Sequence, residues 1–461
     1  MTLARSAPVR PAFDVLLLFA LLIARLHINA AAEASLFEHV ANVTRHPWLG
    51  RLLSPQAWAA FGPWQGDAIF LLLAAISLLA FLFYALVDLS RARLGKKRCL
   101  RLKMGLLWLI LLALVILPTL KLALLRHDNL PHSYSHDGGV IQTEVAITYF
   151  LAGRNPYVEN YHDTPMADWG FPEFRTALDH YPYLPATFLL SAPVKLLAEA
   201  LLGWYDQRFT YLLLFLITLA LLPRLAVTAA DKLGLTMLVG LNPIMGLDLL
   251  FGQNDSFVLA WIVASVYALS RGRRGWAAIF LGVALASKPT AWFLAPFWAL
   301  ALLVDRPLSW RGALHALPTL ARRAAPALAI FLLLTLPYLL WQPTAFIDDV
   351  WRWAAGATPT HYQIWGLGFA NFVLASGALT DRFASWPFWL PELLATLPLL
   401  GLLLHRQLRH NGIAPACWHG GLLLFTFAYF SRFLNENYLG FLLALFALGY
   451  YLNPDAPPAA E

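Results

Sequence analysis

The sequence predicts an all-α membrane protein, a polytopic bundle of about 11 to 13 transmembrane helices, some broken or re-entrant, with a large extracytoplasmic loop that carries short helices. Of 461 residues, 59% are hydrophobic and only 13% are charged, whereas a soluble domain carries about a quarter of charged residues. Apolar runs recur along the whole chain, and each span needs about 20 residues. Cys99 and Cys417 are too few for a disulfide framework. This composition excludes an ordinary soluble enzyme and a disordered chain.

Basic residues set the predicted topology. Seven cations lie between residues 91 and 103 with no acid among them, which is typical of a cytoplasmic loop. The net charge of +7 is therefore a topology signal, and we expect no nucleic-acid partner. Outer loops are expected at 126–183, which holds eight acids against three arginines, and at 342–385. The expected spans whose limits are clearest lie near 12–30, 67–88, 104–125, 324–341, 386–404, 416–431 and 438–452.

Three parts of the chain are expected. Residues 1–103 form an N-terminal transmembrane pair with the basic loop, 104–304 form the part that carries the first outer loop, and 305–461 form C-terminal transmembrane helices with the second outer loop. Two further segments are expected to be broken inside the membrane. Residues 184–203 contain two prolines and are expected to form a re-entrant hairpin, and two short helices are expected to meet at depth within 276–304.

The first candidate for chemistry is Asp137, in the segment His136-Asp137-Gly138-Gly139 soon after a span. If the helix expected over 139–151 begins as early as residue 137, Asp137 and Glu144 lie along one face. Two carboxylates beside a membrane cavity suit a general base that takes a proton from a hydroxyl. Alternatively, Asp137 only caps the helix, because Asp is a preferred capping residue.

A second candidate is the run Gln253, Asn254 and Asp255 after Gly252, at the outer end of one expected span. Three amide or carboxylate side chains in a row could hold sugar hydroxyls by paired hydrogen bonds. Alternatively, Asn254 or Asp255 caps the helix that follows.

Two basic residues and one histidine are further candidates for the site. Lys288 lies far from the basic loops, and a charge near the bilayer centre costs roughly 2.5–3.5 kcal/mol, so a functional cavity with an anionic phosphate is its natural place. The alternative is a lysine that reaches the surface. Arg432, in a tight outer turn, could bind a phosphate through its guanidinium or pair with Glu436. His361 is a weaker candidate, because a single loop histidine is more often incidental.

At these motifs the sequence resembles the GT-C superfamily of membrane glycosyltransferases, in the branch that uses polyprenyl-phosphate sugars and includes mycobacterial phosphatidylinositol-mannoside mannosyltransferases. The resemblance rests on the segment from Asp137 to Tyr157, on Gly-Gln-Asn at 252–254, and on the run from Leu281 to Pro289. It covers residues 104–304, and the C-terminal part only through 432–438.

The resemblance implies a multi-pass protein of the plasma (inner) membrane that moves a hexose or pentose, mannose-like in preference, from a polyprenyl-phosphate sugar to an acceptor hydroxyl on the extracytoplasmic side, with inversion. In this scheme Asp137 is the general base, Lys288 and Arg432 hold the donor phosphate, and Glu144 has no fixed role. The candidates for binding the sugar or the acceptor are Arg154, Asn155, Tyr157, Gln253, Asn254, Asp255, His361 and Glu436.

The expected partners are the lipid-linked sugar donor, the bilayer, and a glycolipid, polysaccharide or protein acceptor. No cofactor and no metal are expected, and the sequence sets no oligomeric state. A transporter or flippase of a lipid-linked saccharide is the alternative, because charges within the membrane and broken helices are equally natural there.

Overall fold

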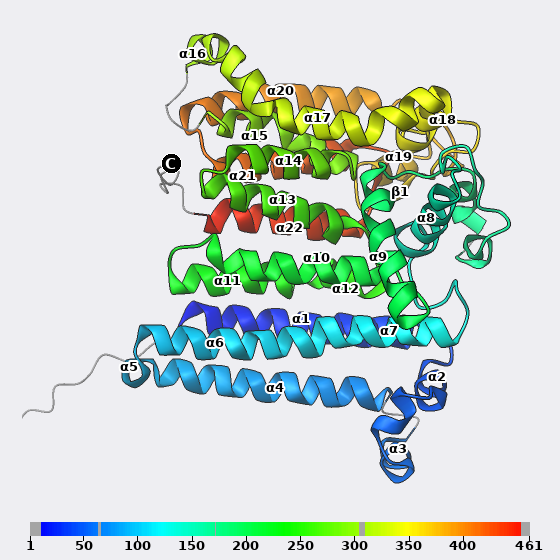
Figure 1. Cartoon of the computed structure of the whole chain (residues 1–461), viewed down its shortest axis with the longest axis vertical. Coiled ribbons are helices and arrows are strands. Elements are labelled where there is room, and N and C mark those ends of the chain that lie inside the picture. Colours follow the sequence, from blue (N-terminus) through cyan, green and yellow to red (C-terminus); the bar gives the residue numbers. More distant parts are fainter. Residues whose placement is uncertain (1–10, 63–65, 171, 304–308, 453–461) are drawn as a thin grey trace, which may run out of the picture.

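The computed structural model describes residues 11–62, 66–170, 172–303 and 309–452, and for residues 172–174, 246 and 247 it describes the backbone alone. Within these ranges the chain is all-α, as predicted, apart from one pair of two-residue parallel strands, β1 (Trp365–Gly366) and β2 (Phe433–Leu434). The helices lie side by side in one bundle (Figure 1).

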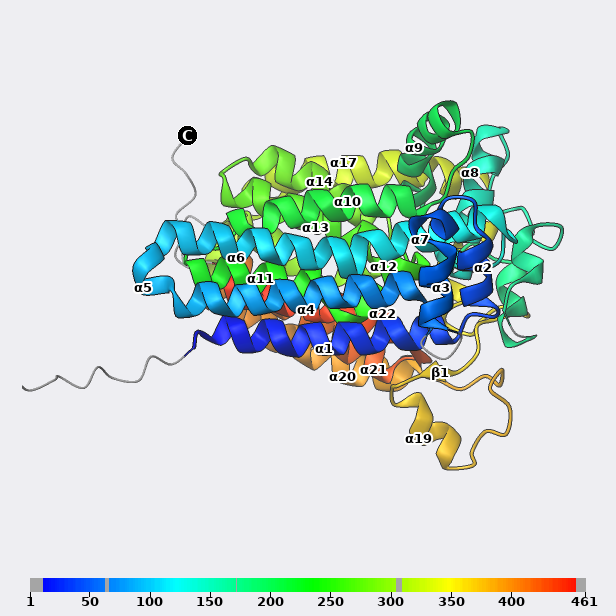
Figure 2. The ribbon, with the colours of Figure 1, turned by 90° about the horizontal axis from the view of Figure 1, so that it is seen from below.

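The bundle helices run between two ends, as Figures 1 and 2 show. We call the end with α5 the basic end, and the end with segments 129–185 and 342–388 the loop end. The helices of the bundle are α1 (Phe13–Ala34), α4 (Ala68–Leu89), α6 (Lys96–Leu111), η2 (Leu112–Ile116), α7 (Leu117–Asp128), α10 (Arg208–Leu221), α11 (Ala229–Gly240), α12 (Pro243–Phe251), α13 (Asp255–Ser270), α14 (Arg274–Leu285), α15 (Ala295–Ala301), α17 (Leu317–Trp341), α20 (Trp389–Arg409), α21 (Ile413–Phe430) and α22 (Glu436–Tyr451).

Short elements join them. At the basic end these are α5 (Arg91–Leu94), η6 (Leu222–Arg224) and α16 (Trp310–His315). At the loop end these are α2 (His39–Arg45), η1 (Leu49–Leu52), α3 (Pro55–Phe61), η3 (Asp137–Gln142), α8 (Thr143–Leu151), η4 (Pro165–Asp168), η5 (Pro172–Leu178), α9 (Ala186–Leu202), η7 (Pro289–Phe293), α18 (Pro343–Ile347), η8 (Asp348–Arg352) and α19 (Ala370–Ala375). The two segments expected as outer loops both lie at the loop end and carry short helices, and we keep the names first and second outer loop for them.

Several helices are long and apolar enough to cross a membrane, so the chain is a membrane protein. They are α1, α4, the continuous helix Lys96–Asp128, α17 and α21, and the bent pair α11–α12 would make a sixth span. Helix α4 illustrates why such a segment is helical and apolar enough to cross a membrane. Its first twenty residues carry no charge, and the Asp67 side chain accepts a hydrogen bond from the Ile69 amide at its start. The full count of 11 to 13 spans depends on shorter helices and stays a prediction.

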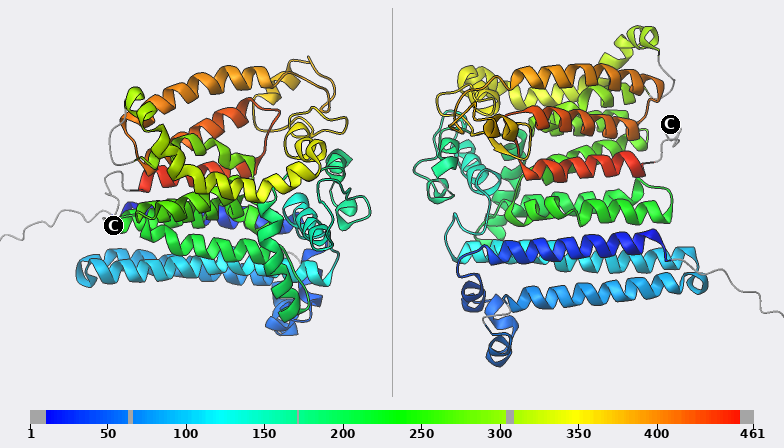
Figure 3. Two further views of the ribbon diagram at one scale, coloured as in Figure 1. Left: turned by 45° about the horizontal axis from the view of Figure 1, so that its top comes forward. Right: turned by 180° about the vertical axis from the view of Figure 1, so that it is seen from behind.

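Helix α9 differs from the expectation. The predicted re-entrant hairpin over 184–203 is wrong, because α9 is one helix despite Pro193 and runs across the direction of the bundle (Figure 3). The Leu184 and Ala186 amides donate to the carbonyls of Ser287 and Ala286, which fixes the start of α9 at the loop end. Its later leucines, such as Leu201, are exposed and suit a position along the membrane interface.

Two central helices are short. Helix α13 has 16 residues and α14 has 12, about 24 and 18 Å at 1.5 Å per residue, less than a hydrocarbon core of about 30 Å. Helix α14 and α15 meet through η7 just after Lys288, so the two short helices expected within 276–304 are present. The segments next to these helices, the α12–α13 turn and η7, line a hollow at the loop end.

One buried apolar cluster extends from Leu18 in α1 to Leu452 after α22. The three predicted parts therefore share a core. The predicted boundary at residue 103 falls inside α6, because the basic segment is itself mostly helical. The boundary at 304/305 lies outside the described residues.

Candidate functional site

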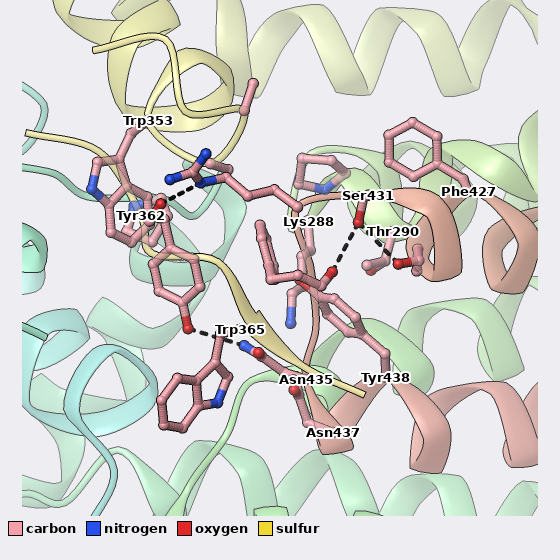
Figure 4. Close-up of a pocket in the computed structure, with 18 of the residues that line it drawn as sticks. Lys288, Thr290, Trp353, Tyr362, Trp365, Phe427, Ser431, Asn435, Asn437 and Tyr438 are labelled. Carbon is pink, nitrogen blue, oxygen red and sulfur yellow. Dashed lines mark hydrogen bonds between the residues drawn. The ribbon is translucent and has the colours of Figure 1, made fainter. Parts of the chain in front are cut away.

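The hollow at the loop end is a cavity of about 1220 Å³. Side chains from both outer loops, the α12–α13 turn, η7, α20, α21 and the α21–α22 turn line it. Figure 4 shows Trp353, Tyr362 and Trp365 on one side of Lys288, and Phe427 and Thr290 on the other. The expected site residues that line the cavity are Asp137, Gln253, Lys288, Arg432 and Glu436.

Glycines bring the first two motifs into contact. The His136 amide donates to the Phe251 carbonyl at 2.7 Å. A Cβ on Gly139 would lie 2.0 Å from the carbonyl oxygen of Gly252, so no side chain fits there. Gly252 itself has a positive φ of 86°, which favours glycine. The turn before η3 therefore packs directly on residues 251–253, and both segments reach the cavity.

Asp137 is the carboxylate of this turn. Burial raises its pKa above the ordinary value, and the neighbouring His136 offsets part of that effect. Its hydrogen bonds come from the backbone amides of Asp137 and Gly138, and no described side chain donates to it. A carboxylate with a raised pKa and no side-chain partner, open to a cavity, can accept a proton from a ligand hydroxyl.

Glu144 does not share this position, which corrects the expected common face. Its two oxygens accept from the Arg126 guanidinium at 2.8 Å each, and the Gln207 amide donates to the same carboxylate. The helix does begin at residue 137, but η3 is a π-helical turn. Each residue of a π-helix advances by a smaller angle, so Glu144 points away from the side of Asp137.

Arg126 and Glu144 belong to a structural ion cluster. Arg126 also donates to Asp206 at 2.9 Å, and Asp206 accepts from Arg208 at 2.7 Å. Arg208 further donates to the carbonyls of Tyr134 and Leu250. The cluster therefore joins α7, α8 and α10 to the turn that carries Asp137.

Lys288 lines the cavity with only 7% of its surface exposed, so it does not reach the outside. Its ammonium donates to Asn254 Oδ1 at 3.1 Å and Asp255 Oδ1 at 2.9 Å. Asn437 Nδ2 donates to the other Asp255 oxygen at 2.5 Å, and the Tyr438 ring lies 5.2 Å from the ammonium. The Asn254 side chain makes no capping hydrogen bond to α13 and instead accepts one from Lys288.

Arg432 lines the cavity, where a phosphate role stays a prediction, but the expected pairing with Glu436 is absent from the described part of the chain. It is 2% exposed, and it donates to the carbonyls of Tyr362, Arg382 and Ala384. Burial lowers its pKa to about 10. No ion pair with Glu436 forms among the described residues. Arg432 thus fastens the second outer loop to the α21–α22 turn, beside the strand pair, while Glu436 stands at the cavity wall.

The Gly153–Tyr157 turn lies away from the cavity lining. Arg154 pairs with Glu159 at the surface, and its guanidinium lies 4.5 Å from the centre of the Tyr149 ring. Asn155 accepts from the Tyr157 amide at 3.2 Å. Tyr157 is buried in a cluster rich in aromatic side chains, mostly from the two loops and α9, and its hydroxyl donates to the Tyr183 carbonyl. These contacts shape the loop, so the structure does not bring the three residues to the cavity.

His361 does not line the cavity either. One ring nitrogen lies 2.6 Å from the Thr358 carbonyl oxygen, and the other contacts the Phe383 carbonyl oxygen. The ring therefore joins two parts of the second outer loop, as an incidental loop histidine would. Asp255 and Asn254 do not line the cavity; Asp255 contacts the lining residues Lys288 and Asn437, and Asn254 contacts Lys288.

Sequence reasoning missed several residues of the lining. Asp248 in α12 and Glu392 in α20 are acids inside largely apolar helices, and both line the cavity. The rule that ionisable residues within spans mark functional cavities would have found them. The aromatic residues Tyr183, Trp353 and Trp365 carried no such signal, because their segments read as ordinary loops.

The fold and the cavity define a polytopic helical membrane protein with a mixed polar and apolar site at one end of the bundle. No protein-family model matches the chain, and no curated protein sequence matches it.

Proposed function

We propose that this protein is a membrane glycosyltransferase of the GT-C type, which transfers a hexose or pentose from a polyprenyl-phosphate sugar to an acceptor hydroxyl. One observation carries the proposal. A single cavity joins a carboxylate without a side-chain partner, a buried lysine and an apolar branch, as Asp137, Lys288 and the residues around Phe427 show.

The apolar branch suits the lipid part of such a donor. It lies between η7, α15, α20 and α21. Its lining residues are Phe293, Pro296, Leu400, Leu423, Leu424 and Phe427. The cavity volume exceeds the 300–1000 Å³ typical of small-molecule pockets. A lipid-linked sugar phosphate would place its tail in this branch and its anionic head beside Lys288.

The polar part of the cavity suits the chemistry. Asp137 takes the proton of the acceptor hydroxyl, and the hydroxyl oxygen attacks the anomeric carbon. The bond from that carbon to the phosphate oxygen breaks, polyprenyl phosphate leaves with the electron pair, and the configuration inverts. Because the leaving group is already a stabilised phosphate anion, protonation by a second acid is less needed than in glycosidases.

Other cavity groups have supporting roles. Lys288 uses two of its three N–H donors within the protein and keeps one for the phosphate. Gln253 and Glu436 can bind sugar or acceptor hydroxyls. The positive-inside rule favours an extracytoplasmic loop end, and the resemblance implies a plasma (inner) membrane. No cofactor enters this scheme, and the sugar and the acceptor stay open.

Transfer from radiolabelled polyprenyl-phosphate mannose in reconstituted membranes tests the proposal, with a membrane lipid extract as acceptor. We expect Asp137→Asn to lower the rate by about 10²–10⁴-fold. Asp163→Asn, an exposed acid of the same loop outside the cavity lining, is the matched control and should keep the wild-type rate.

A near wild-type rate in Asp137→Asn would contradict the proposed base. Movement of the labelled donor across the membrane without any sugar transfer would instead support the transporter alternative.

A further inference from the structure

We propose that Asp255 is a positioning residue that sets how tightly the cavity holds a phosphate, by sharing the Lys288 ammonium with it. The inference rests on the proposed function and goes beyond it. Asp255 is fully buried and does not line the cavity, so it acts through Lys288 rather than on a ligand.

A row of hydrogen bonds fixes this arrangement. Asn437 at the start of α22 donates to one Asp255 oxygen at 2.5 Å, and Lys288 donates to the other at 2.9 Å. Lys288 also donates to Asn254 at 3.1 Å. The ammonium is thereby held at the cavity wall with no ligand bound, and one N–H is left for a phosphate oxygen.

Two other buried lysines each contact two carboxylates, an arrangement that we call a closed cluster. Lys103 donates to Asp14 and Asp88 at 2.6 and 2.8 Å. Lys121 contacts the carboxylates of Glu33 and Asp67. Neither lines the cavity. Lys288 differs because an amide, Asn254, stands where a second carboxylate would be.

The single carboxylate has two consequences. It compensates the buried ammonium in the empty cavity, where an unpaired charge would be costly. Its negative charge also lies close to the position of a bound phosphate and weakens phosphate binding, since Coulomb repulsion between near charges is strong in a partly desolvated site. Asp255 therefore lets polyprenyl phosphate leave after transfer.

Two opposite substitutions test this inference in the purified full-length protein. Asp255→Asn removes the competing charge and should tighten the binding of farnesyl phosphate on the order of tenfold. Asn254→Asp gives Lys288 two carboxylates, as Lys103 and Lys121 have, and should weaken binding by a similar factor. Inorganic phosphate, measured in parallel, should bind less tightly than farnesyl phosphate and follow the same order of variants.

Transfer kinetics give a second readout. In Asp255→Asn we expect the donor KM and kcat to fall together and inhibition by farnesyl phosphate to strengthen, because release of the lipid phosphate becomes slow. A residue that only supports the fold would not lower KM and kcat together while strengthening product inhibition. Asp67→Asn is the matched control, because it removes a buried carboxylate from Lys121 outside the cavity lining, and it should leave farnesyl phosphate binding unchanged.

The inference is overturned if a folded Asp255→Asn protein binds farnesyl phosphate no more tightly than wild type. It is also overturned if Asn254→Asp binds as tightly as wild type, and this arm stands even where Asp255→Asn fails to fold. Wild-type transfer without these shifts would refute the inference alone, whereas absence of any transfer by the wild type would refute the proposed function.

Discussion

The N-terminal helices and the cavity wall both contain buried lysines, but the side chains that compensate the lysine charge differ between the two regions. In the N-terminal region Lys103 links α6 to α1 and α4 through Asp14 and Asp88, and the Tyr84 hydroxyl also donates to Asp14. In the cavity Lys288 has one carboxylate partner and one amide partner.

The difference separates structure from candidate function. A buried cation between two carboxylates has its charge fully compensated within the protein, so it joins helices and offers little to a ligand. A buried cation with a free donor facing a cavity offers a binding site for an anion. The same residue type at similar burial therefore has different uses, and the number of carboxylates around it distinguishes them.

Breaking a closed cluster gives the largest expected effect on stability. Lys103→Met leaves Asp14 buried without its cation and leaves Asp88 only its longer ion pair with Arg91, and we expect the free energy of unfolding in detergent to fall by about 3–5 kcal/mol. Lys288→Met should cost about 1–3 kcal/mol, because among the described residues Asp255 is the one carboxylate that loses its cation and Asn437 still donates to it. Equal losses in the two variants would contradict the comparison.

The ion cluster beside Asp137 provides the next test. Glu144→Gln removes the bidentate contact with Arg126, which keeps Asp206, and should lower the free energy of unfolding by about 1–3 kcal/mol. Because Glu144 does not line the cavity, farnesyl phosphate should bind this variant as it binds wild type. Thermal unfolding and binding measured on one preparation check both statements. A change in affinity without a loss of stability would place Glu144 in the site.

Asp137 should show the opposite pattern to the structural acids. Its pKa in the fold is raised above the unfolded value, so its ionisation costs stability at pH above the folded pKa, and that cost disappears as the pH falls. Wild type should therefore gain stability as the pH is lowered through this pKa, whereas Asp137→Asn should not. Thermal unfolding over a pH series measures this difference.

The transfer rate should move the other way, because a base acts only when it is ionised. We expect kcat/KM to fall as the pH drops through the same raised pKa of Asp137. If the stability of wild type and of Asp137→Asn depended on pH in the same way, the raised pKa of the Asp137 carboxyl would be contradicted.

Much of this arrangement could be predicted from the sequence. Apolar runs and basic loops placed α1, α4, α17 and both outer loops, because hydropathy and positive charge are local properties of the chain. Charge scarcity also singled out Asp137 and Lys288, which line one cavity although 151 residues separate them.

The rest depended on contacts between distant segments. The carbonyl partners of Arg432 come from the second outer loop, and no pattern near residue 432 indicates them. The π-turn of η3, which turns Glu144 away, also leaves no mark in hydrophobic spacing. Local patterns predict which groups are unusual, whereas tertiary contacts decide whether each partner is protein or ligand.

The smallest expected effect concerns Arg154, which the resemblance placed among the binding residues. Its ion pair with Glu159 is exposed, and solvent screening leaves such pairs with little effect on stability. Arg154→Ala should therefore leave both transfer and the free energy of unfolding nearly unchanged. Tyr157→Ala, in the same turn, should cost about 3–5 kcal/mol, because it removes a buried aromatic side chain. A rise in donor or acceptor KM in Arg154→Ala, with stability unchanged, would show that this turn reaches a substrate outside the cavity.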